Sequence, residues 1–227
     1  NGQSLHTERV QDALRQYPPD YLIVAVDGLT DDVNSVYRKG ARLAPALDGV
    51  RALARWKQER GARRPVLVCR FLALRRNARQ LPVLGWFAAV AGFALVSHRA
   101  LTIIDSAEGP HRSLVPTEDA LRAYRYDDDG RVARGDFVCQ HAFSFPTILA
   151  DGTVTVCEQD FNGTRAYGVL RADGSFRDIW WGARAATVRR TVRDRPAEYS
   201  FCRNCPRADR PLSSCNLSSH ALRPFEV

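Results

Sequence analysis

The stretch that decides the fold of the C-terminal half is FVCQHAFSFPTILADGTVTVCEQD, residues 137–160. Asp151-Gly152 within it is a turn signal, and the alternating Thr-Val run that follows predicts a β-strand. The segment is therefore expected to form an antiparallel hairpin. Cys139 and Cys157 are expected on opposite arms of this hairpin, with both sulfurs on one side.

A second cysteine pair lies downstream in FCRNCP, residues 201–206. Cys202 and Cys205 form a C-x-x-C, a spacing that sets two sulfurs on one tight turn. The two pairs together can direct four thiolates at one point, which is the ligand set of a structural zinc ion or of an iron–sulfur cluster. Both accept tetrahedral thiolates, so the spacing leaves both open, with disulfides or free thiols as a further alternative.

Length and composition restrict the class of protein. The chain has 227 residues, 45% of them apolar, which suffices for one large domain or for one and a half small ones. No apolar run reaches the ~18 uncharged residues of a membrane span without a break, and the first residues lack the build of a signal peptide. We therefore expect a cytoplasmic protein without a membrane partner, whose cysteines bind metal rather than form a disulfide framework.

The net charge of +8 comes almost entirely from arginine. Nucleic-acid binders tend to gather arginines on one face or along one helix. Here the arginines are spread through every predicted helix and interleaved with acidic residues. A solvated helix surface explains this pattern better than a nucleic-acid interface does, and an anionic partner remains the second interpretation.

The N-terminal half alternates apolar runs with amphipathic segments. Strands are predicted over residues 21–28, 66–74 and 93–97, and helices over residues 45–60 and 78–91, the second of them capped by its preceding asparagine. Strand–helix–strand units with connections of this length form right-handed crossovers and a parallel sheet. The predicted fold class is therefore α/β, with too few strands for a closed barrel.

The pattern changes after residue 105. Residues 106–136 are polar and rich in turn residues, and we interpret them as a linker between a first domain at residues 1–105 and a second at residues 137–227. In the second domain one helix is expected over residues 176–193, with its tryptophans packed beneath the hairpin. The tail from residue 207 is expected to be irregular.

These features together resemble the C-terminal part of a radical S-adenosylmethionine (SAM) enzyme with a SPASM domain or its shorter twitch form. Asn1-Gly2 is similar to the Thr-Asn-Gly that ends the third barrel strand of that family, and YLIVAVDG, residues 21–28, resembles the fourth. The Asp151-Gly152 hairpin leads through valines to a cysteine, as in the family. Gly168-Val169-Leu170 and Asp178-Ile179-Trp180 then precede the C-x-x-C in the family's order.

The resemblance implies a partial (β/α)6 radical SAM barrel, strands four to six, followed by a small α+β SPASM/twitch domain with a β-hairpin. It also implies one auxiliary [4Fe–4S] cluster held by Cys139, Cys157, Cys202 and Cys205. A full SPASM domain has seven cysteines and two clusters. Since only Cys215 follows the C-x-x-C here, the single-cluster twitch arrangement fits better.

The activity that the resemblance implies is that of a radical SAM oxidoreductase or maturase. SAM is cleaved at a second [4Fe–4S] cluster, hydrogen is abstracted from a small-molecule or peptide substrate, and the auxiliary cluster accepts an electron or positions the substrate. An external electron donor such as flavodoxin or ferredoxin is implied as well. The C-x3-C-x2-C motif that binds the second cluster is absent from these residues and is expected upstream of Asn1, so this chain alone is expected to be inactive.

Candidate cofactor contacts lie in the first domain. Active sites of parallel α/β folds collect at the carboxyl ends of strands, and Asp27, Arg70 and Ser97 lie on or just after predicted strands. We therefore expect Asp27 to contact SAM or the substrate, Arg70 to contact the SAM carboxylate and Ser97 to lie at the cofactor, although a polar strand end without a functional role is an equal interpretation of Asp27. His98 and Arg99 share the same edge and are candidates for substrate contact.

The alternative function is a non-catalytic binding module. In that interpretation zinc or a cluster only stabilises the fold, and the arginines contact RNA or an acidic partner. Cys69, in the middle of an apolar run, is expected to be a buried structural residue in either case.

Overall fold

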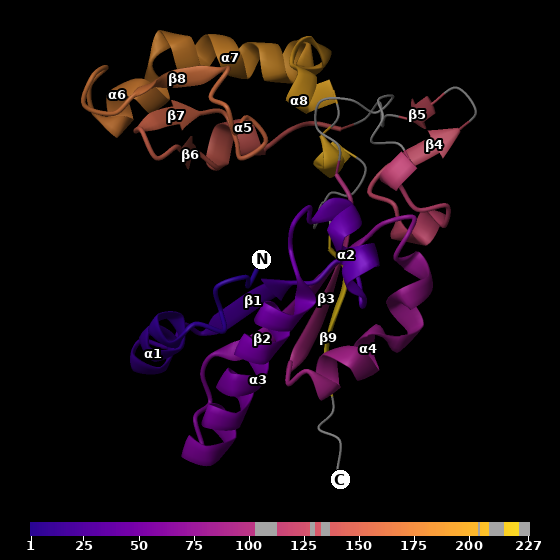
Figure 1. The fold of residues 1–227 in the computed structure, drawn as a ribbon. Helices are drawn as coiled ribbons and strands as arrows, with labels where there is room; N and C mark the ends of the chain where they lie inside the picture. The colour runs from indigo at the N-terminus through magenta and orange to yellow at the C-terminus, as the bar shows by residue number, and fades with distance from the viewer. Residues whose placement is uncertain (103–112, 128–129, 133–136, 204, 209–215, 223–227) are drawn as a thin grey trace. The chain divides into compact units, whose positions relative to one another are not determined.

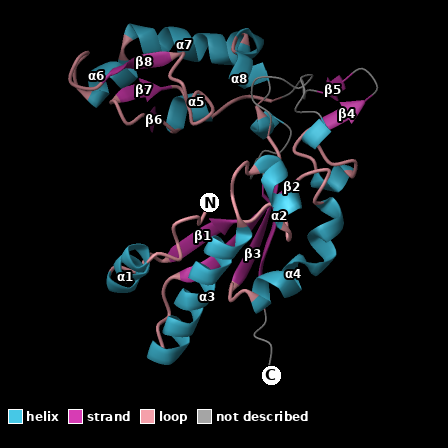
Figure 2. Ribbon diagram, viewed as in Figure 1, coloured by secondary structure: helices cyan, strands magenta, loops and turns pink. Residues whose placement is uncertain are grey.

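The computed structural model describes residues 1–102, 113–127, 130–132, 137–203, 205–208 and 216–222 (Figure 1). These residues form two compact units, each with its own hydrophobic core. Unit 1 contains the described residues up to 101, together with 113–123 and 216–222, and unit 2 contains 102 and 124–208. Sheets and helices occur in both units, so the predicted mixed α/β class is confirmed (Figure 2).

Unit 1 is built on an open four-stranded sheet with the order β1-β2-β3-β9. The three predicted strands are confirmed and pair in parallel, as β1 (Tyr21–Ala25), β2 (Val66–Ala73) and β3 (Leu95–Ala100). Val24, Cys69 and Val96 stand side by side across them, and each is at most 2% exposed. This burial explains the continuous apolar runs, and it confirms Cys69 as a core residue.

Helices pack against this sheet and complete the core of unit 1. Their bounds are α1 (Glu8–Gln16), α2 (Asp31–Tyr37), α3 (Leu43–Arg60), η1 (Ala78–Gln80) and α4 (Leu81–Val90), with η3 (Asp119–Leu121) further along the chain. Val50 and Leu53 of α3 and Leu84 and Ala88 of α4 are fully buried. Leucine and valine at this helical spacing form the inner face that the sequence predicted.

Asn77 does not cap a helix, contrary to expectation. Its side chain makes no capping hydrogen bond, and α4 begins only at Leu81, after the short η1. The Asn77 amide nitrogen instead donates to the carbonyl oxygens of Asp27 and Leu72, each at 2.8 Å, and its oxygen accepts from Leu74 N–H at 2.7 Å. The residue is fully buried, so contacts between strand ends satisfy its amide.

The tail also differs from the prediction of an irregular segment. Residues Asn216–Ala221 form β9, which pairs antiparallel with β3 and belongs to unit 1. Its sequence NLSSHA carries no alternating apolar pattern, because it lies at the edge of the sheet with residues 219–221 exposed. The ladder continues at Leu222, whose N–H donates to Ala94 O at 2.9 Å.

Unit 2 contains a three-stranded antiparallel sheet in the order β6-β7-β8 and a separate two-stranded hairpin. The predicted turn at Asp151-Gly152 is confirmed: Gly152 has φ +88°, and the Asp151 carboxylate accepts from Thr153 N–H at 2.9 Å. The strands are β6 (Thr147–Ile148), β7 (Thr153–Thr155) and β8 (Ala166–Val169), with β4 (Arg125–Asp127) and β5 (Gly130–Val132) in the hairpin. β4, β5 and η3 fall within the segment interpreted as a linker.

The long helix predicted over residues 176–193 is two helices. α6 (Phe176–Trp181) ends and α7 (Ala183–Asp194) begins at Gly182, which has an extended backbone. A methyl group on Gly182 would come within 2.7 Å of the Asp178 carbonyl oxygen, so the break requires glycine. Trp180 packs in the core as expected, but Trp181 is 73% exposed.

The remaining elements of unit 2 are short. They are α5 (His141–Ser144), η4 (Pro196–Glu198), α8 (Ser200–Arg203) and η5 (Pro206–Ala208). Within the described part of the chain, no helix is both long and apolar enough to cross a bilayer.

Candidate metal centre

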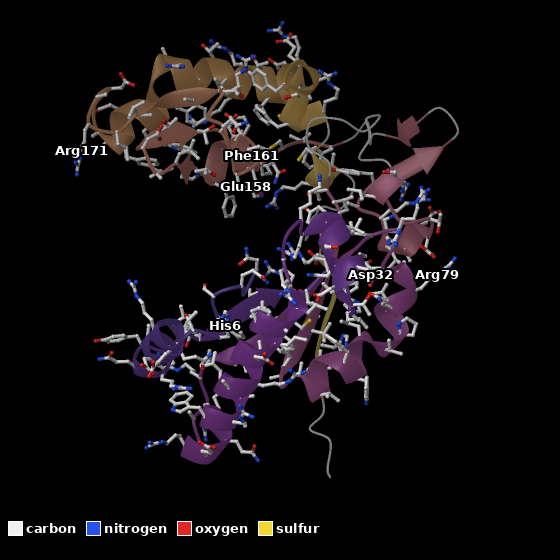
Figure 3. The ribbon with its side chains drawn as sticks, in the orientation of Figure 1. His6, Asp32, Arg79, Glu158, Phe161 and Arg171 are labelled. Atoms are coloured by element: carbon white, nitrogen blue, oxygen red, sulfur yellow. The ribbon has the colours of Figure 1, made fainter. Side chains whose placement is uncertain are left out.

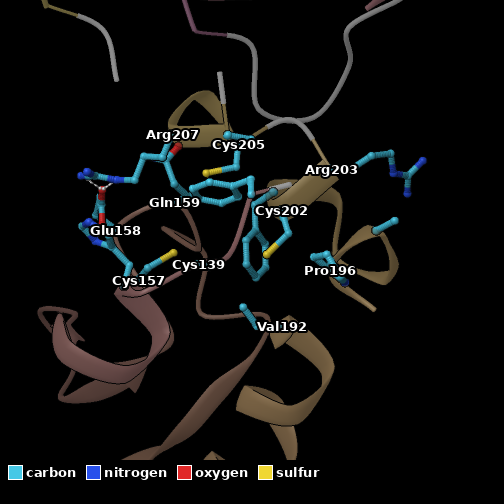
Figure 4. A pocket seen from close by; sticks show the side chains of 15 residues that line it. Cys139, Cys157, Glu158, Gln159, Val192, Pro196, Cys202, Arg203, Cys205 and Arg207 are labelled. Atoms are coloured by element: carbon cyan, nitrogen blue, oxygen red, sulfur yellow. Dashed lines mark hydrogen bonds and ion pairs between the residues drawn. The ribbon is translucent and has the colours of Figure 1, made fainter. Parts of the chain in front are cut away.

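Four cysteines line one cavity of about 230 Å³ in unit 2, and Figure 4 shows their side chains around it. They are the predicted ligands Cys139, Cys157, Cys202 and Cys205, so the structure brings together all four sulfurs. In the described ranges, no three His, Cys, Asp or Glu side chains are close enough to share a single ion. The sulfurs thus surround a cavity rather than the position of a single metal ion. Cys215, the further cysteine of the tail, lies outside the described residues.

Cys139 is not on an arm of the hairpin, which corrects the expectation. It lies in the irregular segment before α5, and β6 begins only at Thr147. Cys157 follows β7 as predicted and is 9% exposed, next to the buried Val156. The two cysteines therefore reach the cavity from a loop and from a strand end.

The C-x-x-C joins two short helical turns. Cys202 lies in α8, where its N–H donates to Tyr199 O at 3.0 Å, and Cys205 directly precedes η5. Cys205 N–H donates to Cys202 O at 3.2 Å. This backbone hydrogen bond turns the chain so that both sulfurs face the same cavity.

Burial makes three of the cysteine thiols weak acids. It raises the pKa of Cys157 to about 12 and raises the pKa values of Cys202 and Cys205, and repulsion between the thiolates adds to the effect. Thiolates must therefore be stabilised by the positive charge of the metal, and loading the site releases protons. A thiol set of this kind fits a thiolate-bound metal centre.

Backbone amides oppose this effect at two of the sulfurs. Backbone hydrogen bonding by Gln159 and Asp160 acts on the Cys157 thiol, and that by Arg207 and Ala208 acts on the Cys205 thiol. The N–H groups of Asp160 and Ala208 donate to the carbonyl oxygens of Cys157 and Cys205 at 3.1 and 3.2 Å. In both cases the backbone hydrogen bonding to the thiol lowers its pKa. Hydrogen bonds to ligand sulfurs are one of the features by which a protein sets the potential of an iron–sulfur cluster.

Asp160, a residue that the sequence interpretation missed, holds the loop that supplies two of these amides. Its carboxylate is 3% exposed and accepts hydrogen bonds from the hydroxyls of Thr155 and Thr164 and from the N–H groups of Thr164 and Arg165. Four donors on one buried carboxylate fix the chain directly after Cys157. The available signal was an aspartate two residues before Asn162-Gly163-Thr164, a composition typical of side-chain-stabilised turns.

An ion pair at the rim connects the two ligand segments. Arg207, two residues after Cys205, donates to the Glu158 carboxylate at 2.6 and 3.1 Å, and Glu158 directly follows Cys157 (Figure 4). His141 Nδ1 lies 3.5 Å from the same carboxylate. Burial acts to raise the pKa of Glu158, but the hydrogen bond and charge of Arg207, a backbone hydrogen bond and the charge of His141 together lower it. Glu158 is labelled near the exposed Phe161 in Figure 3.

Asp27 lies just after β1, inside unit 1, with no exposed surface. One carboxylate oxygen accepts from Leu72 N–H at 2.8 Å, and the other pairs with Arg38 Nε at 2.6 Å. Asp27 N–H donates to the Asn34 side chain at 2.9 Å. Burial raises the pKa of Asp27, and the contacts with Leu72 and Arg38 counteract it only in part.

Arg70 and Ser97 are neighbours in register across β2 and β3. Arg70 Nε is buried and has no hydrogen-bond partner among the described residues, while the Ser97 hydroxyl accepts from that of Ser219 at 3.3 Å. The His98 ring meets His220 edge to face at 5.5 Å. Contact of Asp27, Arg70 and Ser97 with SAM, and of His98 or Arg99 with a substrate, stays a prediction.

A comparison with protein families identifies the cysteine-bearing segment. Residues 139–206 match the model of SPASM, described as an iron-sulfur cluster-binding domain. The match begins at Cys139 and includes Cys205, so it contains all four cysteines of the cavity. The predicted SPASM resemblance is confirmed. A search of curated proteins found no match.

Proposed function

We propose that this chain, in which residues 139–206 form a SPASM iron–sulfur cluster-binding domain, carries the auxiliary cluster of a radical SAM oxidoreductase or maturase. The observation that carries the proposal is the convergence of four cysteines on one cavity inside the matched segment. Cys139, Cys157, Cys202 and Cys205 hold one [4Fe–4S] cluster there. Their donor chemistry fits, because four thiolates are the usual ligand set of such a cluster.

The residues around the cavity suit a cluster that transfers electrons or positions a substrate. When bound, the cluster supplies a one-electron acceptor or an iron that can hold a substrate group. Part of the cavity wall is apolar and restricts the access of water to the sulfurs; it is formed by Phe137, Val192 and Phe201. The pair of Arg207 with Glu158 holds the segments of Cys205 and Cys157 together.

Unit 1 has the role of the SAM-binding part in this proposal. Its parallel strands β1, β2 and β3 correspond to strands four to six of a partial (β/α)6 barrel, with β9 as an added antiparallel edge. Asp27, Arg70 and Ser97 contact SAM, and a second [4Fe–4S] cluster is bound through a C-x3-C-x2-C motif that these residues lack. The substrate is a small molecule or a peptide, and a flavodoxin or ferredoxin in the cytoplasm supplies electrons.

The experiment that tests the proposal measures iron, sulfide and zinc per chain, with a visible spectrum, on anaerobically purified and reconstituted protein. About four irons and four sulfides, with thiolate-to-iron charge-transfer absorption, are expected. One zinc per chain without colour contradicts the proposal and favours a non-catalytic module that binds RNA or an acidic partner.

A cysteine variant and a matched control complete the test. Cys202→Ser removes one ligand, so the iron content is expected to fall and unit 2 to lose stability. Cys69→Ala removes a thiol from the core of unit 1 and is expected to leave the iron content unchanged. If Cys202→Ser retains the iron content of the wild type, the ligand assignment is wrong.

A further inference from the structure

Arg189, in the middle of α7, is a buried cation without a buried anion beside it. The residue is 8% exposed, and within the described part of the chain no carboxylate forms an ion pair with it. A charge in such a position is costly unless hydrogen bonds and polarisable groups replace water. Its presence in a small core calls for a specific role.

Carbonyl groups and aromatic rings replace the water around this guanidinium. Arg189 Nε donates to Ala142 O at 2.9 Å, and one terminal nitrogen donates to Trp180 O at 2.6 Å. The guanidinium carbon lies 3.9 Å from the centre of the Trp180 ring and 5.0 Å from that of Tyr167. Rings and carbonyls stabilise the positive charge without neutralising it. The positive charge of Arg189 therefore has no carboxylate paired with it among the described residues.

The contact with Ala142 connects Arg189 to a cluster ligand. Ala142 lies in α5, a helix of four residues that begins two residues after Cys139. Tyr167 OH donates to the same Ala142 carbonyl at 3.1 Å. Since a helix this short has little stability of its own, these two hydrogen bonds determine where the Cys139 segment lies.

The charge is also close to the cavity. Val192, three residues after Arg189 and therefore on the same side of α7, lines the cavity wall. Tyr167, on which Arg189 stacks, interacts electrostatically with both Cys139 and Cys157. A cluster held by four thiolates gains negative charge when it is reduced. A fixed cation in a water-poor core favours that reduced form.

We propose that Arg189 is a positioning residue for the auxiliary cluster: it holds the Cys139 segment through Ala142, and its unneutralised charge raises the reduction potential of the cluster. The inference rests on the proposed function, because it requires that the four cysteines bind an iron–sulfur cluster. It assigns to α7 a part in cluster chemistry beyond packing.

The test compares reconstituted full-chain protein with two variants of adjacent arginines. Arg189→Gln removes the buried charge. Arg190→Gln removes an exposed charge whose side chain donates to the Thr187 hydroxyl. Redox titration followed by the visible and electron paramagnetic resonance spectra should show a lower midpoint potential for Arg189→Gln. Arg190→Gln should keep the wild-type potential. Equal potentials in Arg189→Gln and the wild type would overturn the role of the charge.

Two further variants keep the inference testable if Arg189→Gln does not fold. Arg189→Lys keeps the charge but loses the forked donors, and Tyr167→Phe keeps the ring but removes the second hydrogen bond to Ala142. Both are expected to keep a potential near that of the wild type and to lose iron to a chelator several-fold faster. Iron loss at the wild-type rate in both would overturn the positioning role. Wild-type protein that binds no iron would instead contradict the proposed function itself.

Discussion

At the scale of single residues, Asp160 shows how a buried carboxylate supports a metal site that it does not enter. Its carboxylate accepts one hydrogen bond from Thr155 in β7 and three from Thr164 and Arg165 in the loop after Cys157, and its N–H donates to Cys157 O at 3.1 Å. A change at this position acts on the fold and on the ligand together.

Asp160→Asn is expected to lower the free energy of unfolding by about 1–3 kcal/mol, because the amide nitrogen of asparagine is a donor and would face hydroxyl and N–H groups that now donate to the carboxylate. Faster iron loss should accompany the change. Urea denaturation and a chelator challenge measure the two effects. Asp151→Asn is the matched control, since it removes one exposed carboxylate whose turn hydrogen bond an asparagine can also make. Equal effects of the two substitutions would contradict this role of Asp160.

Asp27 makes a pH-dependent contribution whose sign follows from its raised pKa. A carboxyl with a pKa above its ordinary value of 3.8 binds protons more tightly in the folded than in the unfolded chain. Its stabilising contribution is therefore present below about pH 3.8 and is lost as the pH rises through the folded pKa. Asp27→Asn, which cannot titrate, should gain stability relative to the wild type as the pH rises from 4 towards neutrality, as measured by urea midpoints.

Asp32 provides a control of opposite sign. A hydrogen bond from Thr30 lowers the pKa of this exposed carboxyl, which Figure 3 labels. Its contribution is present above pH 3.8 and is lost as the pH falls through the folded pKa. Asp32→Asn should therefore lose stability relative to the wild type as the pH rises from 3 to 5. The same trend in both variants would show that burial does not control the pKa of Asp27.

At the scale of elements, the contact of α1 with α3 depends on one glycine. A methyl group on Gly49 of α3 would lie 2.6 Å from the Leu5 backbone. The Gln11 side chain bridges the two segments, donating to Leu5 O at 2.7 Å and to Gly49 O at 2.9 Å. The close approach is thus a condition for burying α1.

Gly49→Ala is expected to destabilise the protein by about 1–3 kcal/mol, although alanine is the better helix former, because the added methyl separates α1 from α3. Gly85→Ala in α4 is the control: among the residues that the structure describes, its methyl would meet only Leu222, at 3.8 Å. This variant should gain up to about 1 kcal/mol from helix propensity. Thermal denaturation distinguishes them, and a stabilised Gly49→Ala would refute the contact.

At the scale of the whole molecule, the two units have separate cores, and the four cysteines belong to only one of them. Cys157 lies within the core of unit 2, and Cys139 and Cys202 pack against it. A ligand that binds only the folded state stabilises the unit that contains its site. Cluster binding should therefore act on unit 2.

Hydrogen exchange with and without the cluster tests this expectation. Removal of iron should lower the protection of amides in α5, β7 and α7 of unit 2 and leave β1, β2 and β3 of unit 1 unchanged. Loading should also be more complete at higher pH, because burial raises the pKa of the ligand thiols and they must lose protons to bind. An equal loss of protection in both units would contradict two separate cores.

Local pattern was sufficient for part of the fold and for the main features of the site. The apolar runs predicted β1, β2 and β3, because strands buried on both faces need apolar residues at nearly every position. The Asp151-Gly152 turn and the spacing of four cysteines predicted the hairpin and the converging thiols. The apolar runs, the turn and the C-x-x-C each lie within a short segment, whereas the convergence of the two cysteine pairs was expected from their number and type.

Tertiary structure alone decided the remaining features. β9 forms because the edge of β3 offers hydrogen-bonding groups. The polar sequence of β9 does not predict this pairing. Asn77 and Asp160 became buried connectors because carbonyl, hydroxyl and amide groups from separate segments meet around them. Arg189 lies over Trp180 because α6 and α7 fold back at Gly182. Such roles depend on which hydrogen-bonding groups lack a partner within their own segment once the chain has folded, and only the three-dimensional arrangement determines that.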